Sequence, residues 1–267
     1  MTPVEVTRGD GPVVLGMPHT GTWLPEEVQA RLNARGRALA DTDWHVHRLY
    51  DGLLPGATAV RATFHRYVID ANRDPTGASL YPGQATTDLV PLTDFDGAPI
   101  WADPPGDDEI AARREAFHAP YHAALAAELE RVRARHGVAI LYDCHSIRSV
   151  IPHLFDGLLP DFNIGTDGGA TCAPPVERAV REICAGAKGY TSVLNGRFRG
   201  GWTTRHYGRP AEGLHAIQME LAQRTHLVDE TAGWALDAAK ADRLRPHLAR
   251  ILSALAEMAP ALTAPGR

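Results

Sequence analysis

Short apolar runs alternate along the chain with segments of helical periodicity, and this alternation restricts the possible fold class more than any other feature. The runs at 13–17 and 138–142 are apolar throughout, as in strands that are buried on both faces. The longest helical pattern covers 107–136, with Gly137 as its stop signal and Pro120 as an expected kink. Because strands that are separated by helices form a largely parallel sheet, the sequence predicts an α/β fold with a mainly parallel sheet.

The remaining elements fit the same pattern. The segment 214–221 is predicted to be a strand, and its alternation places Gln218 and Glu220 opposite its apolar side chains. The stretch 72–105 contains six prolines and is predicted to be a long irregular excursion, of the kind that often walls an active site. We also expect a strand at 58–69, helices at 25–36, 176–188 and 235–258, and a short helix capped by Asp41 or Thr42.

Composition favours a single domain over residues 1–267. The chain is 44% hydrophobic, which is enough for a sizeable core, and its net charge of −5 gives no general attraction to nucleic acid or anionic lipid. No apolar run approaches the roughly 20 residues of a membrane-spanning helix. Three cysteines without CxxC spacing, and an N-terminus without the features of a secretory signal, favour a reducing compartment. We therefore expect a cytoplasmic protein that binds neither nucleic acid nor membranes, and no heptad pattern predicts its oligomeric state.

One histidine follows each of the two fully apolar predicted strands, 13–17 and 138–142. His19 comes after 13–17 in PHTG, and His145 comes after 138–142 in DCHS. Because the carboxyl ends of parallel strands meet in one crevice, both imidazoles are expected to face it. A satisfied polar group in the core is the alternative for each histidine, but two at equivalent places favour a ligand role. Two histidines and one carboxylate are a common catalytic zinc set, with a fourth position left for water.

Other histidines compete for a metal-binding role. His45 and His47 form an HxH pattern, but their segment is predicted to be helical, and residues two apart diverge on a helix. His118 and His122 share a helical face but lack the Glu of an HExxH motif. We interpret these four as surface histidines or as residues behind the site. Asp43 is a candidate third ligand, with helix capping as its alternative role.

Glu220 is a carboxylate in an otherwise apolar predicted strand, AIQMEL. A buried carboxylate must be paired or protonated, because an isolated charge is expensive to bury. Burial raises the pKa of such a group toward the working range, which suits a general base that acts on water beside a metal. A structural salt bridge with Arg209 or Arg224 is the alternative.

Arginines are concentrated near these candidates although the protein is acidic. Arg66 and Arg73 bracket HRYVIDANRD, and Arg148 lies three residues after His145. Guanidinium groups bind carboxylates through paired hydrogen bonds, so this concentration predicts a small anionic substrate. Solvated surface charge is the alternative for any single arginine. A second group stands among glycines and aromatic residues in NGRFRGGWTTRHYGRP: Arg197, Arg199, Arg205 and Arg209.

Motifs for competing chemistry are missing from the sequence. It contains no GxSxG elbow, no Walker A loop and no Rossmann GxGxxG. Cys144 directly precedes His145 in a predicted strand end, so the two side chains should point in opposite directions and do not form a catalytic pair.

Seven segments carry a resemblance to a known family. In order from residue 14 to residue 226 they are VLGMPHTGTWLP, DTDWHVHRLYD, RYVIDANRDP, LYPGQATTDLVPLT, LYDCHSIRS, NGRFRGGWTTRHYG and LHAIQMELAQRTH. Each segment alone is weak, but the ordered set is specific. The set resembles the N-formylglutamate amidohydrolases, also called N-formylglutamate deformylases.

This resemblance implies a three-layer α/β/α fold with a mainly parallel mixed sheet, like that of the zinc-dependent exopeptidases (phosphorylase/hydrolase-like). It implies an enzyme that hydrolyses the linear amide bond of N-formyl-L-glutamate, giving formate and L-glutamate in histidine degradation. One divalent metal is expected, Zn²⁺ first and Co²⁺ as a substitute. Three alternatives stay open: another N-acyl amino acid as substrate, a cell-wall amide, or a non-catalytic protein that binds carboxylates.

A more distant likeness to the aspartoacylases, which are zinc amidohydrolases, implies roles for single residues. His19 and His145 match their metal histidines. Thr22 stands where their ligand Glu would be, so Asp43 is our candidate for the third ligand. Glu220 in QMEL occupies the place of the catalytic Glu.

The same likeness implies how the substrate is held. Asn72 and Arg73 in DANRD match the DLNR element that binds a substrate carboxylate. We expect Arg66 to stabilise the oxyanion, and Arg205 with Arg148 to hold the second carboxylate of a small dicarboxylate substrate. The Pro-rich stretch 80–101 is expected to wall this site.

Overall fold

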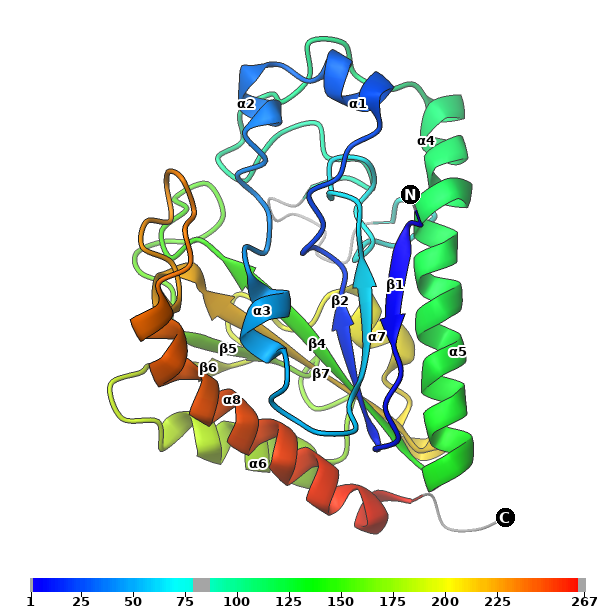
Figure 1. The fold of residues 1–267 in the computed structure, drawn as a ribbon, viewed down its shortest axis with the longest axis vertical. Helices are drawn as coiled ribbons and strands as arrows, with labels where there is room; N and C mark the ends of the chain where they lie inside the picture. The colour runs from blue at the N-terminus through cyan, green and yellow to red at the C-terminus, as the bar shows by residue number, and fades with distance from the viewer. Residues whose placement is uncertain (1, 79–86, 264–267) are drawn as a thin grey trace.

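The structure is a computed structural model that describes residues 2–78 and 87–263, and these form a seven-stranded sheet between helices (Figure 1). The strand order across the sheet is β1-β3-β2-β4-β7-β5-β6. The strands are β1 (Val4–Thr7), β2 (Val13–Met17), β3 (Thr58–Ala62), β4 (Ala139–Ile147), β5 (Phe162–Gly165), β6 (Ser192–Leu194) and β7 (Leu214–Ala222).

Most neighbouring strands run parallel. β2 pairs in parallel with β3 and β4, β4 with β7, and β5 with β6, whereas β1 and β5 run antiparallel to β3 and β7. This confirms the predicted α/β class with a mainly parallel mixed sheet. β4 and β7 pair over nine residues each, and every one of these residues is buried. The site described below is built on this central pair.

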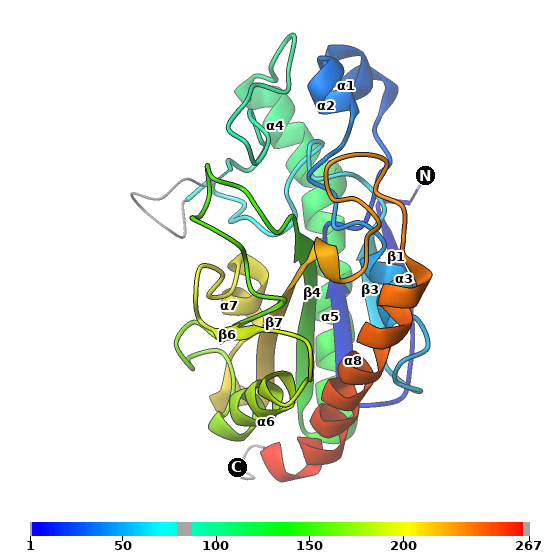
Figure 2. The same cartoon turned by 90° about the vertical axis from the view of Figure 1, so that its left-hand side faces the viewer.

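Helices cover the two faces of the sheet and make three layers. α3 (Val46–Tyr50), α6 (Pro174–Ala185) and α8 (Ala238–Met258) share one hydrophobic core with the sheet, and α5 (Ala119–His136) packs into a second core on the other face. Figure 1 shows α5 on one side of the strands and α6 with α8 on the other. In Figure 2 the turned view places α6 and α8 in front of the sheet and α5 behind it.

Side-chain alternation along the central strands separates the core from the site. On β7, Met219 and Leu221 pack in the core beneath α6 and α8, whereas Glu220 faces the other side, as predicted. On β4, Cys144 packs in that same core, and its neighbour His145 faces the side of Glu220. The predicted divergence of Cys144 and His145 is thus confirmed.

The long helical pattern at 107–136 forms one continuous helical segment with an irregular turn. α4 (Asp107–Arg113) leads through a π-helical turn at Arg114–His118 into α5. The widened turn ends two residues before Pro120, which has no amide hydrogen to donate to the preceding turn. Gly137 ends the helix in the left-handed conformation, with φ of 75°, as predicted.

The predicted strand at 58–69 is too long, because β3 ends at Ala62. Beyond it, the amide of Val68 donates to the carbonyl of His65, and the amide of Tyr67 donates to the His65 ring. These local hydrogen bonds replace a sheet ladder. The side chains of Tyr67 and Val68 are fully buried, which explains why the segment resembles a strand in sequence.

The predicted helix at 25–36 is interrupted. It forms α1 (Glu26–Arg31) and α2 (Ala34–Arg37), because the Asn33 side chain accepts from the amide of Gly36 and starts a new helix. The helices predicted at 176–188 and 235–258 are confirmed as α6 and α8 with small shifts of their ends. No helix within residues 2–78 and 87–263 is long and apolar enough to cross a membrane.

The short helix predicted to begin at Asp41 or Thr42 begins later, at Val46. Asp41 does not cap it, because its carboxylate accepts hydrogen bonds from the Tyr67 hydroxyl and the Phe95 amide. The chain instead passes through turns at 41–45, of which 41–43 are buried, before α3 starts. These turns place Asp43 at the site.

The predicted irregular excursion at 72–105 is confirmed where the structure describes it, at 72–78 and 87–105, which contain no regular helix or strand. Residues 79–86 lie outside the described part of the chain. Trp101 anchors the far end of the excursion, with its indole nitrogen 2.8 Å from the carbonyl of Pro91.

Candidate active site

His19 and His145 reach the same edge of the sheet from neighbouring strands. His19 follows β2, and His145 lies within β4, which pairs with β2 in parallel. The expectation that the second strand ends before His145 is wrong, because β4 continues to Ile147 in register with β7. The two imidazole centroids are 5.1 Å apart.

The three predicted metal ligands form one buried group. One donor atom each of His19, Asp43 and His145 lies within 4.8 Å of the other two. Asp43 Oδ2 is 3.1 Å from His145 Nδ1 and 3.8 Å from His19 Nδ1. His19 Nδ1 is buried and has no hydrogen-bond partner in the described part of the chain. Two imidazoles and a carboxylate that converge in this way can bind a metal ion.

The second ring nitrogen of each histidine contacts a buried carboxylate. His19 Nε2 is 2.6 Å from Asp70 Oδ1, and His145 Nε2 is 3.0 Å from Asp143 Oδ1. The hydrogen bond to Asp70 holds a proton on His19 Nε2 and leaves the His19 Nδ1 lone pair for a metal. Burial lowers the pKa of His145, but Asp143 and Asp43 outweigh it and raise that pKa well above its usual value, so a metal that binds His145 displaces a proton from its ring.

Arg66 holds Asp43, the predicted third ligand, from the other side. Its Nη2 donates to Asp43 Oδ1 at 2.9 Å, and both side chains are buried. The amide of Asp43 also donates to the carbonyl of His19 at 3.0 Å. Burial raises the pKa of Asp43, but Arg66 and His145 outweigh it, so that the pKa is lowered and the carboxylate stays ionised. Oδ1 is thus engaged by Arg66, while Oδ2 faces the two histidines.

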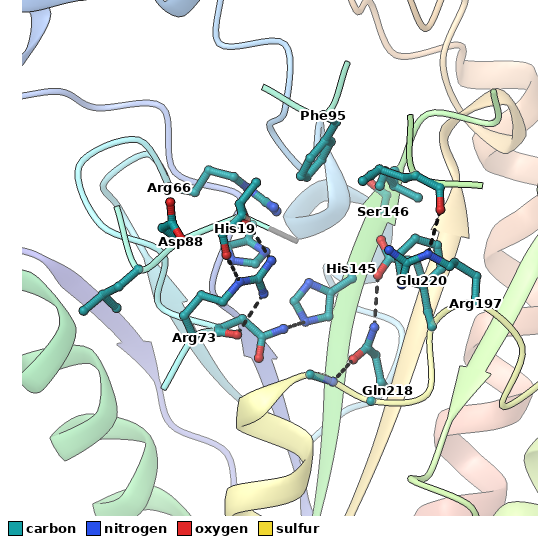
Figure 3. A pocket seen from close by; sticks show the side chains of 18 of the residues that line it. His19, Arg66, Arg73, Asp88, Phe95, His145, Ser146, Arg197, Gln218 and Glu220 are labelled. Carbon is teal, nitrogen blue, oxygen red and sulfur yellow. Dashed lines mark hydrogen bonds between the residues drawn. The ribbon is translucent and has the colours of Figure 1, made fainter. Parts of the chain in front are cut away.

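A pocket lies over this group at the carboxyl ends of β2, β4 and β7 (Figure 3). Four of its lining residues, Thr87, Asp88, Leu89 and Phe95, come from the segment 80–101 that was expected to wall the site; residues 80–86 lie outside the described part of the chain. The other lining side chains of interest are His19, Arg66, Asn72, Arg73, His145, Ser146, Ile147, Leu154, Arg197, Phe198, Gln218 and Glu220.

Glu220 faces the pocket from β7, directly opposite His145 on β4. Burial raises its pKa to about 8, although His145 acts in the opposite direction. Gln218 Nε2 donates to Glu220 Oε2 at 3.0 Å. Arg209 and Arg224, the two predicted alternative partners, each pair with a different carboxylate. A buried carboxylate with a pKa near neutrality is suited to acid–base chemistry.

Asn72 and Arg73 lie beside the histidines at the edge of the pocket. Asn72 Nδ2 is 3.3 Å from His145 Nε2, and Asn72 Oδ1 accepts from the amide of Thr203 at 2.9 Å. Arg73 donates through Nε and Nη2 to the carbonyl and hydroxyl oxygens of Thr87. The structure therefore brings both residues to the pocket with Glu220, Arg66 and the metal-binding group.

Arg148 and Arg205 are not brought to the pocket with the other predicted site residues. Arg148 Nη2 is 3.0 Å from Asp96 Oδ1, and Arg205 Nη2 is 3.1 Å from Asp167 Oδ1. Neither arginine lines the pocket. Arg205 lies on α7 (Trp202–Tyr207), where its Nε donates to a backbone carbonyl at the start of the helix. Arg197, from the same arginine-rich segment, lines the pocket instead.

His118 and His122 lie behind the pocket and support the segment that carries Asn72. His118 Nε2 is 3.0 Å from the carbonyl of Arg73, and His122 Nε2 is 2.7 Å from the carbonyl of Ala71. Burial lowers the pKa of His122 to about 3, so its ring is neutral. These two histidines serve as positioning residues and lie outside the metal-binding group.

Two carboxylates of the site, Asp70 and Asp143, were not predicted from the sequence. Asp143 stands two residues before His145, and strand periodicity puts such residues on one face, so this contact could have been found. Asp70 has no comparable signal. Its contact with His19 joins positions that are 51 residues apart along the chain.

The fold and the site define a class of protein. It is an α/β enzyme in which a buried His–Asp–His group that can bind a metal faces the same pocket as a carboxylate suited to acid–base chemistry. A family model described as N-formylglutamate amidohydrolase matches residues 11–227. The chain belongs to this family, which confirms the resemblance found in the sequence.

Relatives of known name and structure agree with this assignment. The N-formylglutamate deformylase of Pseudomonas aeruginosa is 46% identical over 252 residues, which cover 93% of this chain and 94% of the relative. That of Pseudomonas putida is 45% identical over 251 residues, which cover 93% of each. The crystal structure of an N-formylglutamate amidohydrolase from Ralstonia eutropha has a TM-score of 0.78 at 26% identity, covering 96% of this chain and 98% of that one. A gene product of Agrobacterium tumefaciens shares the fold, with a TM-score of 0.74 at 20% identity over 97% and 96% of the two chains.

Proposed function

We propose that this protein is a zinc-dependent amidohydrolase that cleaves N-formyl-L-glutamate to formate and L-glutamate in histidine degradation. The observation that carries the proposal is the buried group of His19, Asp43 and His145, which faces the same pocket as Glu220. Two relatives at 46% and 45% identity are named for this reaction. The three cysteines are free and buried, in keeping with the cytoplasmic location that we propose.

In this proposal His19 Nδ1, Asp43 Oδ2 and His145 Nδ1 hold the metal. Their donor set suits Zn²⁺, and Co²⁺ can replace it at a site of this kind. When bound, the ion supplies Lewis-acid chemistry, because it polarises the formyl carbonyl and lowers the pKa of water. Asp70 and Asp143 keep the two imidazoles in orientation through their Nε2 atoms.

Glu220 moves the proton of the reaction. Its carboxylate takes a proton from the attacking water and delivers it to the glutamate nitrogen as the C–N bond breaks. Burial raises the pKa of Glu220 to about 8, so a proton that the carboxylate has taken up is held firmly enough to be passed on to the leaving nitrogen. Gln218 holds Oε2 and thereby fixes the plane of the carboxylate beside His145.

Arginine side chains orient the substrate and balance its charge. Asn72 and Arg73 hold one carboxylate of the glutamyl group at the edge of the pocket. Arg66, whose guanidinium lies 4.9 Å from the centroid of the Phe95 ring, provides positive charge for the oxyanion that forms on the formyl oxygen. Holding the diacid at fixed points places its amide over the metal-binding group and lowers the barrier through orientation.

A panel of N-acyl amino acids tests the proposed reaction. Metal-loaded protein is expected to show its highest kcat/KM with N-formyl-L-glutamate and to release formate and glutamate in equal amounts. A higher kcat/KM with an N-acetyl substrate would make it a different amidohydrolase on the same fold. Tight binding of these acids without turnover would make it a carboxylate-binding protein.

A further inference from the structure

Arg197 lines the pocket from the segment between β6 and α7. Figure 3 shows it on the side of Ser146 and Glu220, whereas Arg73 lies on the opposite side of His145. Two guanidinium groups therefore flank the metal-binding group within one pocket. This arrangement suits a substrate that carries an anionic group at each end and its reacting bond between them.

Arg197 is held in place by its neighbours. Its Nε donates to the carbonyl of Leu154 at 2.9 Å, and its guanidinium lies 5.6 Å from the centroid of the Phe198 ring. Phe198 in turn makes an edge contact with Phe155. A guanidinium that is already ordered loses less conformational entropy when it binds an anion, so it discriminates well between anionic and neutral groups.

The pocket wall beside Arg197 is apolar. Ile147, Leu154 and Phe198 all line the pocket and belong to one hydrophobic cluster. Methylene groups that lie against such a wall are removed from water, which favours binding. The glutamyl side chain presents two methylenes followed by a carboxylate, and this part of the pocket presents apolar surface next to the positive charge of Arg197.

We propose that Arg197 binds the side-chain carboxylate of the substrate and thereby selects N-formyl amino acids with an acidic side chain. The proposal rests on the proposed amidohydrolase function and assigns Asn72 and Arg73 to the α-carboxylate. An amide of the same shape as the carboxylate offers the guanidinium one neutral acceptor in place of two charged ones. Arg197 therefore distinguishes the two substrates by the charge of the side chain, because their shapes are the same.

The test compares N-formyl-L-glutamate with N-formyl-L-glutamine in the metal-loaded enzyme. Wild type is expected to prefer the acid by about 100-fold in kcat/KM. In Arg197→Gln, kcat/KM for the acid should fall by about this factor, mainly through KM, while the value for the amide changes only a few-fold. Arg197→Lys keeps the charge without the paired donors and should retain part of the preference, so the proposal stays testable if the glutamine variant does not fold.

Arg199→Gln is the matched control, because Arg199 lies on the same segment but is exposed and does not line the pocket. Its preference for the acid should equal that of wild type. An equal loss on both substrates in Arg197→Gln, or a collapse of the preference in Arg205→Gln instead, overturns the assignment. A wild-type enzyme that cleaves both substrates equally overturns it and leaves the amidohydrolase function standing. Metal-loaded enzyme that cleaves neither substrate overturns both.

Discussion

His145 and Glu220 lie directly opposite each other on the two central parallel strands, β4 and β7. Each is contacted by the residue two positions before it on its own strand: Asp143 lies 3.0 Å from the His145 ring, and Gln218 donates to the Glu220 carboxylate. The central strand pair thereby places the proposed metal ligand and the proposed proton-transfer group side by side. Sites built on such rigid elements hold their geometry more closely than sites built on loops.

Replacing Glu220 by Gln should abolish turnover while metal content and substrate binding remain close to wild type. The amide keeps the size of the side chain but cannot accept the proton of water, so kcat should fall by about 1,000-fold. Formate release, metal analysis and substrate titration on the same preparation check this. Turnover that survives the substitution would remove Glu220 from the proton-transfer role.

Replacing Asp70 by Asn should weaken metal binding by about 10- to 100-fold and leave the fold intact. The change removes the charge that Asp70 presents to His19 Nε2 at 2.6 Å, and with it the preference for a proton on that nitrogen. A competition titration against a metal-binding dye measures the affinity. Glu212→Gln, at a surface carboxylate that pairs with Arg209, is the matched control. Equal affinities in the two variants would contradict the orienting role of Asp70.

The part of the site that lies on or next to the strands could be predicted from the sequence. The apolar run before His19 ends where it was expected to end, and alternation along 214–221 placed Glu220 on the correct face. Both inferences depend on a local periodicity of two that burial enforces. Asp43 was named as a ligand but was expected near the start of a helix. Its place in a buried turn depends on Arg66 and on the carbonyl of His19, contacts that join distant segments.

The part of the site that lies on loops could not be predicted in the same way. Arg197 and Arg205 stand in one Gly-rich segment without periodicity, so nothing local indicates which one faces the pocket. The path of the chain between them includes Gly200 with φ of 111°, a conformation that only glycine adopts readily. Three-dimensional packing of this segment brings Arg197 to the pocket and turns Arg205 toward Asp167.

His122 should make the stability of the fold depend on pH. Burial lowers its pKa from 6.5 to about 3 in the folded protein. Between those values the unfolded chain binds more protons than the folded one, so stability is lost as the pH falls below 6.5. At pH 5 this one group should destabilise the fold by about 2 kcal/mol relative to pH 8.

Urea unfolding of wild type and His122→Gln at both pH values checks this expectation. The glutamine amide can still donate to the carbonyl of Ala71 but does not titrate, so the variant should lose about 2 kcal/mol less on acidification. His153→Gln, at an exposed histidine, should behave as wild type does. An unchanged pH dependence in His122→Gln would show that this ring is not held neutral by the fold.

Turnover that depends on a metal held by His19, Asp43 and His145 is the central claim, and one assay tests it directly. Formate release from N-formyl-L-glutamate is measured on the purified protein, after removal of metal by a chelator, and after Zn²⁺ or Co²⁺ is added back. We predict that turnover disappears with the metal and returns when one equivalent is restored. Full turnover by protein shown to contain no metal would contradict the role assigned to these three residues.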